Sequence, residues 1–354
     1  MRRVNRPRIE LEPMTPWSLR LFDRIPVPAF WVGVAIGLGV FALFLIYTAL
    51  LGAGVGRHNG VAFDAGWGAE LIQDFFLGFA LAITAASIRG TVTDFEALRP
   101  ALEASPSEIE ELRREALRYR RGLLFVVGAV AGSFSALATV SNPQLWEGGQ
   151  MPGWMHPAVL WLGGRNFLTW WVILRAMALE LMLGSAFSRL SDRLGAVDIL
   201  DASALAPFAQ RALRNVSMWM LLAAFVSLTF AGKGWAIPSL MVLGLVNLTG
   251  FALTAFLLPL LGPHRRLRGA KAEELSRARR AIRSTRDHVL AAGSTELAGG
   301  RLADLVAYEA RVAAASEWPI AGSTVVRLGL YLAIGLGSWV GAGLVQHLVE
   351  TTLR

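Results

Sequence analysis

The sequence predicts an all-α membrane protein, a multi-pass transmembrane helical bundle of about seven spans with a cytoplasmic helical hairpin before the last span. Of its 354 residues, 54% are hydrophobic. Only 17% are charged, against about 25% in ordinary globular chains. The charged residues are also clumped, which leaves long stretches with almost none. This pattern is typical of a chain that lies partly in a lipid bilayer.

The first apolar stretch, residues 28–52, is long enough to span a membrane, because about 20 helical residues cross the hydrocarbon layer. It is too long for the apolar region of a cleaved signal peptide, so we expect a permanent anchor. The second stretch has only a short uninterrupted apolar part, residues 75–88, and it needs Glu70, Gln73 and Asp74 in its outer turns. After the first stretch, the predicted spans lie near 70–88, 122–141, 159–187, 215–232, 238–262 and 323–347.

The distribution of arginine predicts the orientation of these spans. Only Arg57 and Lys233 lie in the loops on one side, 53–69, 142–158 and 231–237, whereas the segments on the other side hold most of the Lys and Arg. The positive-inside rule therefore predicts a cytoplasmic N-terminus and, after seven spans, an external C-terminus. The net charge of +8 is explained by this anchoring, so no nucleic-acid partner is expected. Nearly all positive residues are arginine, which is typical of a GC-rich bacterial genome and predicts a bacterial inner membrane.

Two predicted cytoplasmic segments are long enough to contain helices. In SPSEIEELRREALRYRR, Ser107 and Glu110 have the spacing of a capping box, which predicts a helix start there. Residues 263–322 predict a helical hairpin that breaks at Gly293. The expected organisation is a transmembrane bundle with its N-terminal tail in 1–262, the hairpin in 263–322, and the last helix with the C-terminus in 323–354.

Charged residues inside the fourth span are the first candidates for a functional site, because such groups are costly in lipid and usually face the bundle interior. Arg175 lies near the middle of this span, and Glu180 lies about 7–8 Å further along the axis. Arg165 lies near the outer end, at the depth of Asp74 on the second span, so these two could pair. Two other arrangements stay open: Arg165 could reach the outer surface, and Glu180 could bond to Arg189.

Small and polar residues on other spans predict close helix packing. Asn247 shares a face with Gly250 and Thr254, where polar groups serve either as contacts between helices or as a pathway lining. The GxxxG spacing lets helices approach closely, either within one subunit or between copies of the chain. In the second case the protein is a homo-oligomer. This spacing occurs at Gly33 and Gly37, Gly128 and Gly132, and Gly337 and Gly341.

Several chemistries are excluded or disfavoured by what the sequence lacks. It contains no cysteine, no GxxxxGK[ST] loop, no HExxH and no GxSxG, and its five histidines are scattered. We therefore expect no cofactor, no metal and no enzymatic activity. A site formed by Asp64, Glu70, Asp74 and His58 near the outer surface stays open beside the simpler interpretation that these acids are solvated.

The function expected from these observations is that of a channel or transporter. Arg175 in the middle of the membrane favours an anion or a small acidic solute. The pathway candidates are Arg175, Glu180, Arg165, Asp74 and Asn247. The alternative is a non-catalytic membrane scaffold or sensor subunit that acts through the cytoplasmic hairpin. Membrane lipid is an expected partner. The hairpin could hold anionic headgroups or another partner through Arg265, Arg266 and Arg268, beside the simpler interpretation that these arginines only anchor the protein at the inner surface.

Overall fold

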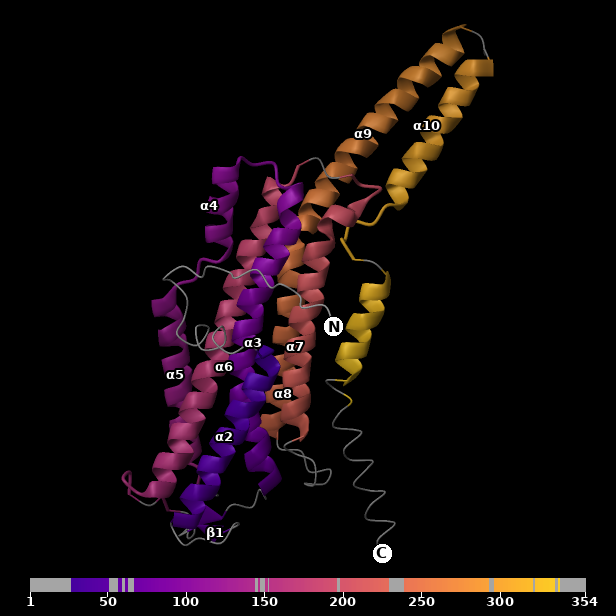
Figure 1. Ribbon diagram of the computed structural model, residues 1–354. Coiled ribbons are helices and arrows are strands. Elements are labelled where there is room, and N and C mark those ends of the chain that lie inside the picture. Colours follow the sequence, from indigo (N-terminus) through magenta and orange to yellow (C-terminus); the bar gives the residue numbers. More distant parts are fainter. Residues whose placement is uncertain are drawn as a thin grey trace, which may run out of the picture. The chain divides into compact units, whose positions relative to one another are not determined.

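The computed structural model is helical almost throughout (Figure 1). It describes residues 27–50, 57–58, 61–62, 67–143, 146, 150–151, 153–195, 198–228, 239–292, 296–320, 322–334 and 337. The helices are α2 (Ala29–Leu50), α3 (Trp67–Leu98), α4 (Pro106–Ala116), α5 (Arg121–Val140), α6 (Pro157–Arg189), α7 (Ala206–Leu228), α8 (Ser239–Leu257), α9 (Leu261–Ala292), α10 (Glu296–Ala314) and a last helix, Gly322–Ile334. The strands β1 (Arg57–His58) and β2 (Val61–Ala62) form a short antiparallel pair in which Arg57 is opposite Ala62.

Five helices in the described residues are long and apolar enough to cross a membrane. They comprise α2, α3, α5, α6 and the helical run that begins in α8 and continues into α9. The prediction of a helical membrane protein is confirmed at this level. The count of seven spans stays a prediction, because α7 carries Arg211 and Arg214 in its early turns and the last helix is described only as far as Ile334.

Some helix ends differ from the expected ones for reasons that the contacts make clear. Helix α3 continues past residue 88 to Leu98, because its last turns are buried and bear polar groups that have partners. Helix α4 is capped by Ser105, not by Ser107: the Ser105 hydroxyl accepts from the Glu108 amide, and the Glu108 carboxylate accepts from the Ser105 amide at 2.7 Å. Pro106 suits the first helical position, where no amide donor is needed, and this moves the start two residues earlier.

The chain forms two compact units. Unit 1 comprises residues 1–86 and 129–176, and unit 2 comprises residues 87–128 and 177–354. Helices α3, α5 and α6 therefore contribute one part to each unit. Each unit has its own packing and its own set of buried charged residues.

In unit 1, glycine allows α2 to lie directly against α3. A Cβ atom at Gly33 would lie 2.8 Å from the carbonyl oxygen of Gly78, and one at Gly37 would lie 2.8 Å from the Cα atom of Phe75. Helix α5 meets α6 in a similar way, since a Cβ atom at Gly132 would lie 2.6 Å from the carbonyl oxygen of Phe167. Small residues thus bring these helices into backbone contact, as in other membrane bundles.

In unit 2, α7 packs along α8, and α9 follows α8 after a 3-10 turn at Leu258–Leu260. The amide of Gly262 donates to the Ser188 hydroxyl at 2.8 Å, and a side chain at Gly262 would collide with the Ser188 carbonyl. The largest fully buried side chains here include Trp219, Phe95 and Phe187. These contacts fix α7, the end of α6 and the end of α3 around one interior.

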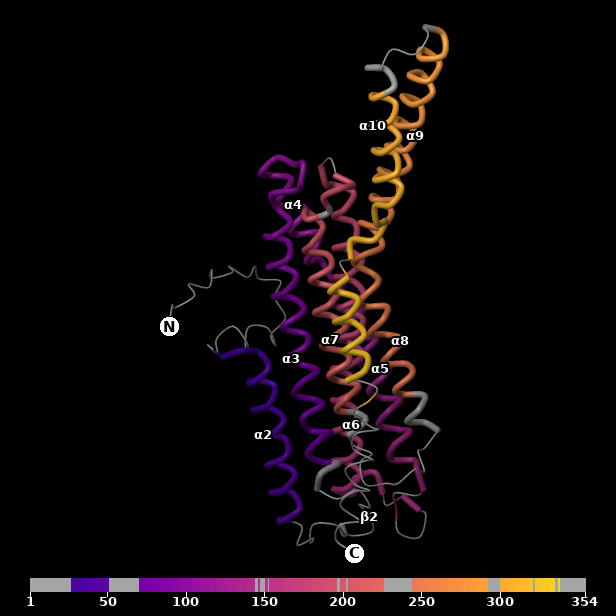
Figure 2. The backbone as a smooth tube through the Cα atoms, turned by 90° about the vertical axis from the view of Figure 1, so that its right-hand side faces the viewer, coloured from indigo at the N-terminus to yellow at the C-terminus, as the bar shows by residue number. Residues whose placement is uncertain are grey.

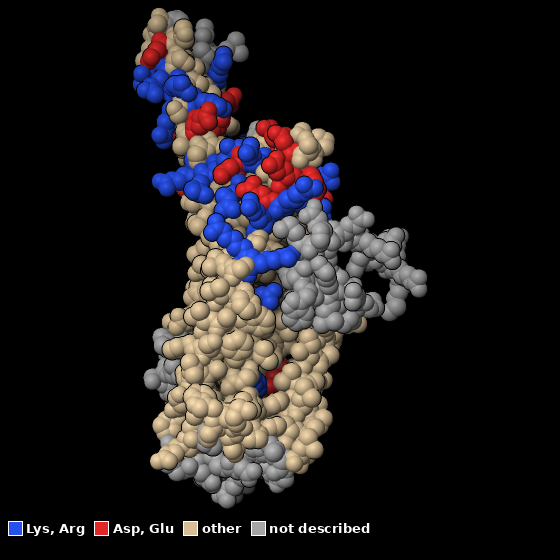
Figure 3. Space-filling model, turned by 90° about the vertical axis from the view of Figure 1, so that its left-hand side faces the viewer, with Lys and Arg blue, Asp and Glu red and all other residues tan. Residues whose placement is uncertain are grey.

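Helices α9 and α10 form an antiparallel hairpin in both views (Figures 1 and 2). Lys271 donates to the carbonyl oxygen of Ala315 at 2.8 Å at its base, and Arg279 pairs with Glu309 at 2.7 Å further along. The expected break at Gly293 lies outside the described residues. Figure 3 shows that the charged side chains gather over this hairpin and over α4.

Candidate functional site

Unit 1 contains a group of polar side chains, here called the Arg165 cluster, on the first turns of α3 and the first half of α6. Its members are Glu70, Gln73, Asp74, Arg165 and Asn166, together with Thr169. On α3 they are three or four residues apart, which places them on one helix face. All but Gln73 are buried.

Arg165 is the central donor of this cluster. Its guanidinium forms an ion pair with Glu70 and donates to Gln73 Oε1 at 2.9 Å. The Gln73 amide then donates to Asn166 Oδ1 at 3.4 Å, and Asn166 donates to the Leu162 carbonyl at 3.0 Å. Because residue 70 meets residue 165 and residue 73 meets residue 166, α3 and α6 run in the same direction here.

Asp74 differs from its neighbours because its carboxyl group has no hydrogen-bond or ion-pair partner among the described residues. Its exposed fraction is 0%. Neither of its carboxyl oxygens accepts a hydrogen bond from any residue that the structure describes. The hydroxyl of Thr169, one turn beyond Arg165 as Asp74 is one turn beyond Glu70, is also buried and unbonded within the described ranges. A buried ionised carboxylate without a partner is too costly to persist, so this carboxyl needs a bound proton, a cation or water.

Unit 2 contains a second group of buried polar side chains, here called the Arg211 cluster. Its members are Ser87, Thr91 and Asp94 of α3, Glu180 of α6, and Arg211, Arg214 and Asn215 of α7. The α3 members are at positions i, i+4 and i+7, and the α7 members are at i, i+3 and i+4. Both patterns place the side chains on one helix face.

Arg211 is the centre of this second cluster, with an exposed fraction of 0%. It donates to the Thr91 hydroxyl at 2.6 Å, and it lies 3.7 Å from the Asp94 carboxylate and 3.6 Å from the Glu180 carboxylate. Its guanidinium carbon also lies 5.0 Å from the centre of the Phe187 ring. The positive charge is therefore enclosed by two carboxylates, a hydroxyl and an aromatic face.

The remaining members complete the bonding of the two carboxylates. Glu180 accepts from the Ser87 hydroxyl and from the Asn215 amide. Asp94 is held by Arg214 through both of its oxygens. Gly90 makes room for this contact, because a Cβ atom there would lie 2.5 Å from the Arg214 guanidinium carbon. Two arginines face two carboxylates, so the Arg211 cluster is balanced in charge.

The structure brings some predicted site residues together and separates others. Asp74 and Arg165 lie in the same cluster, but Arg165 pairs with Glu70. Glu180 pairs with Arg211, and not with Arg189, which the sequence left open as a partner. Arg175 belongs to neither cluster: it is half-buried, and its guanidinium carbon lies 5.6 Å from the centre of the Trp171 ring.

The other candidates lie elsewhere. Asn247 is exposed, as are Gly250 and Thr254 on the same face. Gly128 is buried, whereas a Cβ atom at Gly337 would meet no described atom within 4 Å. Gly341, Asp64 and the side chain of His58 lie outside the described residues.

The sequence interpretation missed the Arg211 cluster because it placed Asp94 and Arg211 in loops. A signal was present: Ser87, Thr91 and Asp94 continue the helical spacing of the second span without a break. Arg211 and Asn215 have the same spacing at the start of the fifth span. Charged residues at helical spacing beside an apolar stretch can belong to the membrane helix when a partner of opposite charge lies on a neighbouring helix.

Within the described ranges, no group of three or more His, Cys, Asp and Glu residues has the geometry of a metal site. Comparison with known proteins adds no further lead: no protein-family model, curated protein or solved structure matches this chain significantly. The functional argument therefore depends on the two clusters and on the surfaces around them.

Proposed function

We propose that this chain is a membrane transport protein in which Asp74 of the Arg165 cluster binds and releases a proton or a monovalent cation. One observation carries the proposal: a fully buried carboxyl on a helix of membrane-spanning length, with neither oxygen bonded within the described part of the chain. Carboxyl groups in such positions mark ion paths and proton relays in membrane proteins.

The proposal includes a topology. The seven apolar stretches support seven spans, the positive-inside distribution of arginine supports a cytoplasmic N-terminus, and the high arginine content supports the inner membrane of a bacterium. In that topology the Arg165 cluster lies toward the external ends of α3 and α6. The Arg211 cluster lies toward their cytoplasmic ends. An ion would then reach Asp74 from the outside first.

The charges of the Arg165 cluster favour a positive ion over an anion. Two carboxyl groups, Glu70 and Asp74, face a single guanidinium, and that guanidinium is occupied by Glu70 and Gln73. The carboxyl of Asp74 and the hydroxyl of Thr169 offer oxygen ligands, which suit a proton or a small hard cation. The expectation of an anion depended on Arg175, which lies over the Trp171 ring outside both clusters.

The test is ion flux into liposomes that contain the purified full chain. An internal pH dye reports proton entry under an imposed membrane potential, and radioactive sodium reports cation entry in a parallel assay. We expect one of these fluxes in the wild type, and a decrease of at least about tenfold in Asp74→Asn, which removes the ionisable group but keeps its size.

The matched control is Asp304→Asn, which makes the same chemical change at an exposed position on α10 and should leave the flux unchanged. Asp74→Glu should retain part of the flux, because it keeps the carboxyl group. A wild type that carries neither ion, or an Asp74→Asn variant with full flux, would contradict the proposal.

A second candidate function is a membrane scaffold or sensor that acts through the α9–α10 hairpin. The charges on this hairpin favour it, because they lie on its surface, where a partner can reach them (Figure 3). Replacing residues 276–310 with a short Gly–Ser turn keeps the Lys271–Ala315 hydrogen bond at the base. The transport proposal expects ion flux to survive this change, whereas a scaffold would lose its partner.

A further inference from the structure

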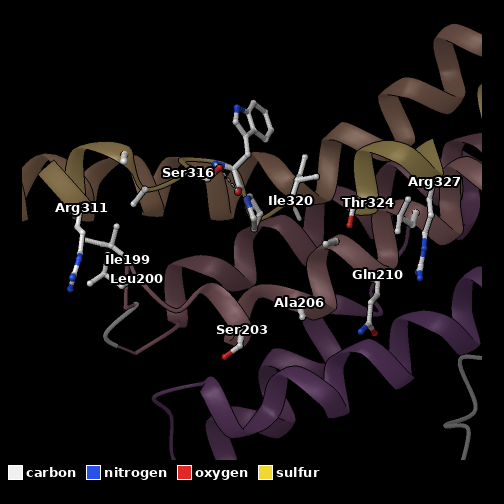
Figure 4. A pocket seen from close by; sticks show the side chains of 16 residues that line it. Ile199, Leu200, Ser203, Ala206, Gln210, Arg311, Ser316, Ile320, Thr324 and Arg327 are labelled. Atoms are coloured by element: carbon white, nitrogen blue, oxygen red, sulfur yellow. Dashed lines mark hydrogen bonds between the residues drawn. The ribbon is translucent and has the colours of Figure 1, made fainter. Parts of the chain in front are cut away.

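Unit 2 has a cavity of about 720 Å³ at the base of the α9–α10 hairpin. Its walls come from the start of α7, the segment before α7, the end of α10 and the first turns of the last helix (Figure 4). This volume lies within the range of about 300–1,000 Å³ that is usual for ligand pockets. Neither buried charge cluster contributes to its lining, so the cavity is separate from the proposed ion site.

The charged groups of the cavity are all positive. Arg311 and Arg327 are the only charged residues among those that line it, and they lie at opposite ends in Figure 4. Neither guanidinium group forms an ion pair or hydrogen bond with a residue that the structure describes. Each of these unpaired guanidinium groups attracts an anion and can bind its oxygens through paired donors.

The acidic residues nearby are turned to other partners. Glu317 pairs with Lys271 at 3.6 Å. Asp201 accepts a hydrogen bond from the Ser203 amide at 3.0 Å, and this bond lowers the pKa of the Asp201 carboxyl. Neither of these two carboxylates lines the cavity.

The rest of the lining is largely apolar, with a few hydroxyl and amide groups. Ile199, Leu200 and Ile320 are among the apolar members, and Ser203 and Gln210 are among the polar ones. Trp318 forms a fixed wall, because its ring stacks on His264 at 4.1 Å and His264 in turn hydrogen-bonds to the Glu317 carbonyl oxygen at 2.8 Å. A ligand that fits must combine an anionic group with apolar parts.

The last helix adds to the positive potential. It begins at Gly322, and Thr324 in its first turn lines the cavity. The first turn of a helix carries amide N–H groups without intrahelical partners and the positive end of the helix dipole. The cavity also lies where the apolar helices of unit 2 give way to the charged hairpin, the level at which lipid headgroups are found.

We propose that this cavity binds the phosphate-bearing headgroup of an anionic glycerophospholipid, with the phosphate on one of the two arginines, Arg311 or Arg327, and the upper acyl chains against the apolar wall. This site is independent of the ion site at Asp74, and either can fail without the other. Arginine at the membrane surface strengthens the binding of anionic lipids.

The test is lipid binding to the detergent-solubilised full chain, measured by native mass spectrometry. The probes are short-chain phosphatidylglycerol, short-chain phosphatidylcholine, and inorganic phosphate as competitor. We expect phosphatidylglycerol to bind and phosphatidylcholine to bind at least about tenfold more weakly. The double variant Arg311→Gln/Arg327→Gln should lose this preference, whereas Arg311→Lys/Arg327→Lys should retain part of it.

The matched control is Arg280→Gln/Arg301→Gln, which removes the same charge from exposed positions on α9 and α10. Ser203→Trp is a second test that leaves the charge intact: it narrows the cavity and should also weaken binding. Equal binding of both lipids, or a preference that persists in the double Gln variant, would overturn the proposal. Displacement of the lipid by inorganic phosphate at equal concentration would also overturn it, in favour of a water-soluble phosphate compound.

Discussion

The Arg165 cluster and the Arg211 cluster are built from the same kinds of residues, on parts of the same helices, but they differ in how the charges are matched. In the Arg211 cluster, two arginines face two carboxylates, and each carboxylate has several donors. In the Arg165 cluster, one arginine faces Glu70 while the second carboxyl, Asp74, has no donor within the described ranges. The first arrangement is complete without a ligand, and the second is not.

This difference indicates a structural role for the Arg211 cluster and a functional role for Asp74. A balanced buried network holds helices in register and loses stability when any member is removed. A buried carboxyl without partners contributes no such stability and is retained only if its binding of an ion is useful. We therefore expect changes in the Arg211 cluster to act on folding, and changes at Asp74 to act on transport.

The largest expected effect comes from Arg211→Met. It leaves the Asp94 and Glu180 carboxylates without their shared cation, and breaking a buried pair in this way costs about 3–5 kcal/mol. Unfolding of the purified protein by a denaturing detergent measures the loss. Adding Asp94→Asn and Glu180→Gln to the same chain should recover part of it. A single variant as stable as the wild type would show that the cluster does not hold the fold.

An effect of opposite sign is expected at Asp74. Asp74→Leu removes a buried polar group that has no hydrogen bond, which should raise the free energy of unfolding by about 1–3 kcal/mol. The matched change Glu180→Leu should lower it, because three donors lose their acceptor. The same unfolding assay compares the two variants. A clear loss of stability in Asp74→Leu would mean that this carboxyl has a structural partner after all.

The smallest effect is expected for Arg175→Gln. Arg175 is half-buried over the Trp171 ring, and such a contact contributes about 0.5–1 kcal/mol. Stability should therefore change by no more than about 1 kcal/mol, and proton or sodium flux should stay near the wild-type rate. Chloride flux in the wild type that disappears in Arg175→Gln would instead restore the expectation of an anion pathway.

The sequence predicted the helical membrane architecture because apolar length is read directly from composition. It also singled out Asp74, Arg165 and Glu180, since a charge inside an apolar stretch is conspicuous. It could not assign their partners. Arg165 meets Glu70 and not Asp74 because the register between α3 and α6 depends on tertiary packing, which helical spacing within one segment does not reveal.

The sequence interpretation also treated arginine near a span as part of a loop. Arg211 has an apolar stretch on one side only, so it resembles an anchoring residue, yet it is fully buried. Its burial depends on Asp94, which is distant in the sequence. The cavity that Arg311 and Arg327 line has the same origin: the two arginines come to line one cavity only after α10 and the last helix fold back on α7.

The most direct test of the account is infrared difference spectroscopy of the full chain in lipid bilayers during a pH step, with wild type compared with Asp74→Asn. The account predicts a band from a protonated carboxyl that appears and disappears in the wild type and is absent in Asp74→Asn, or a band that responds to sodium in the same way. Identical spectra for the two proteins, with respect to both protons and sodium, would contradict the assignment of Asp74 as the ion-binding group.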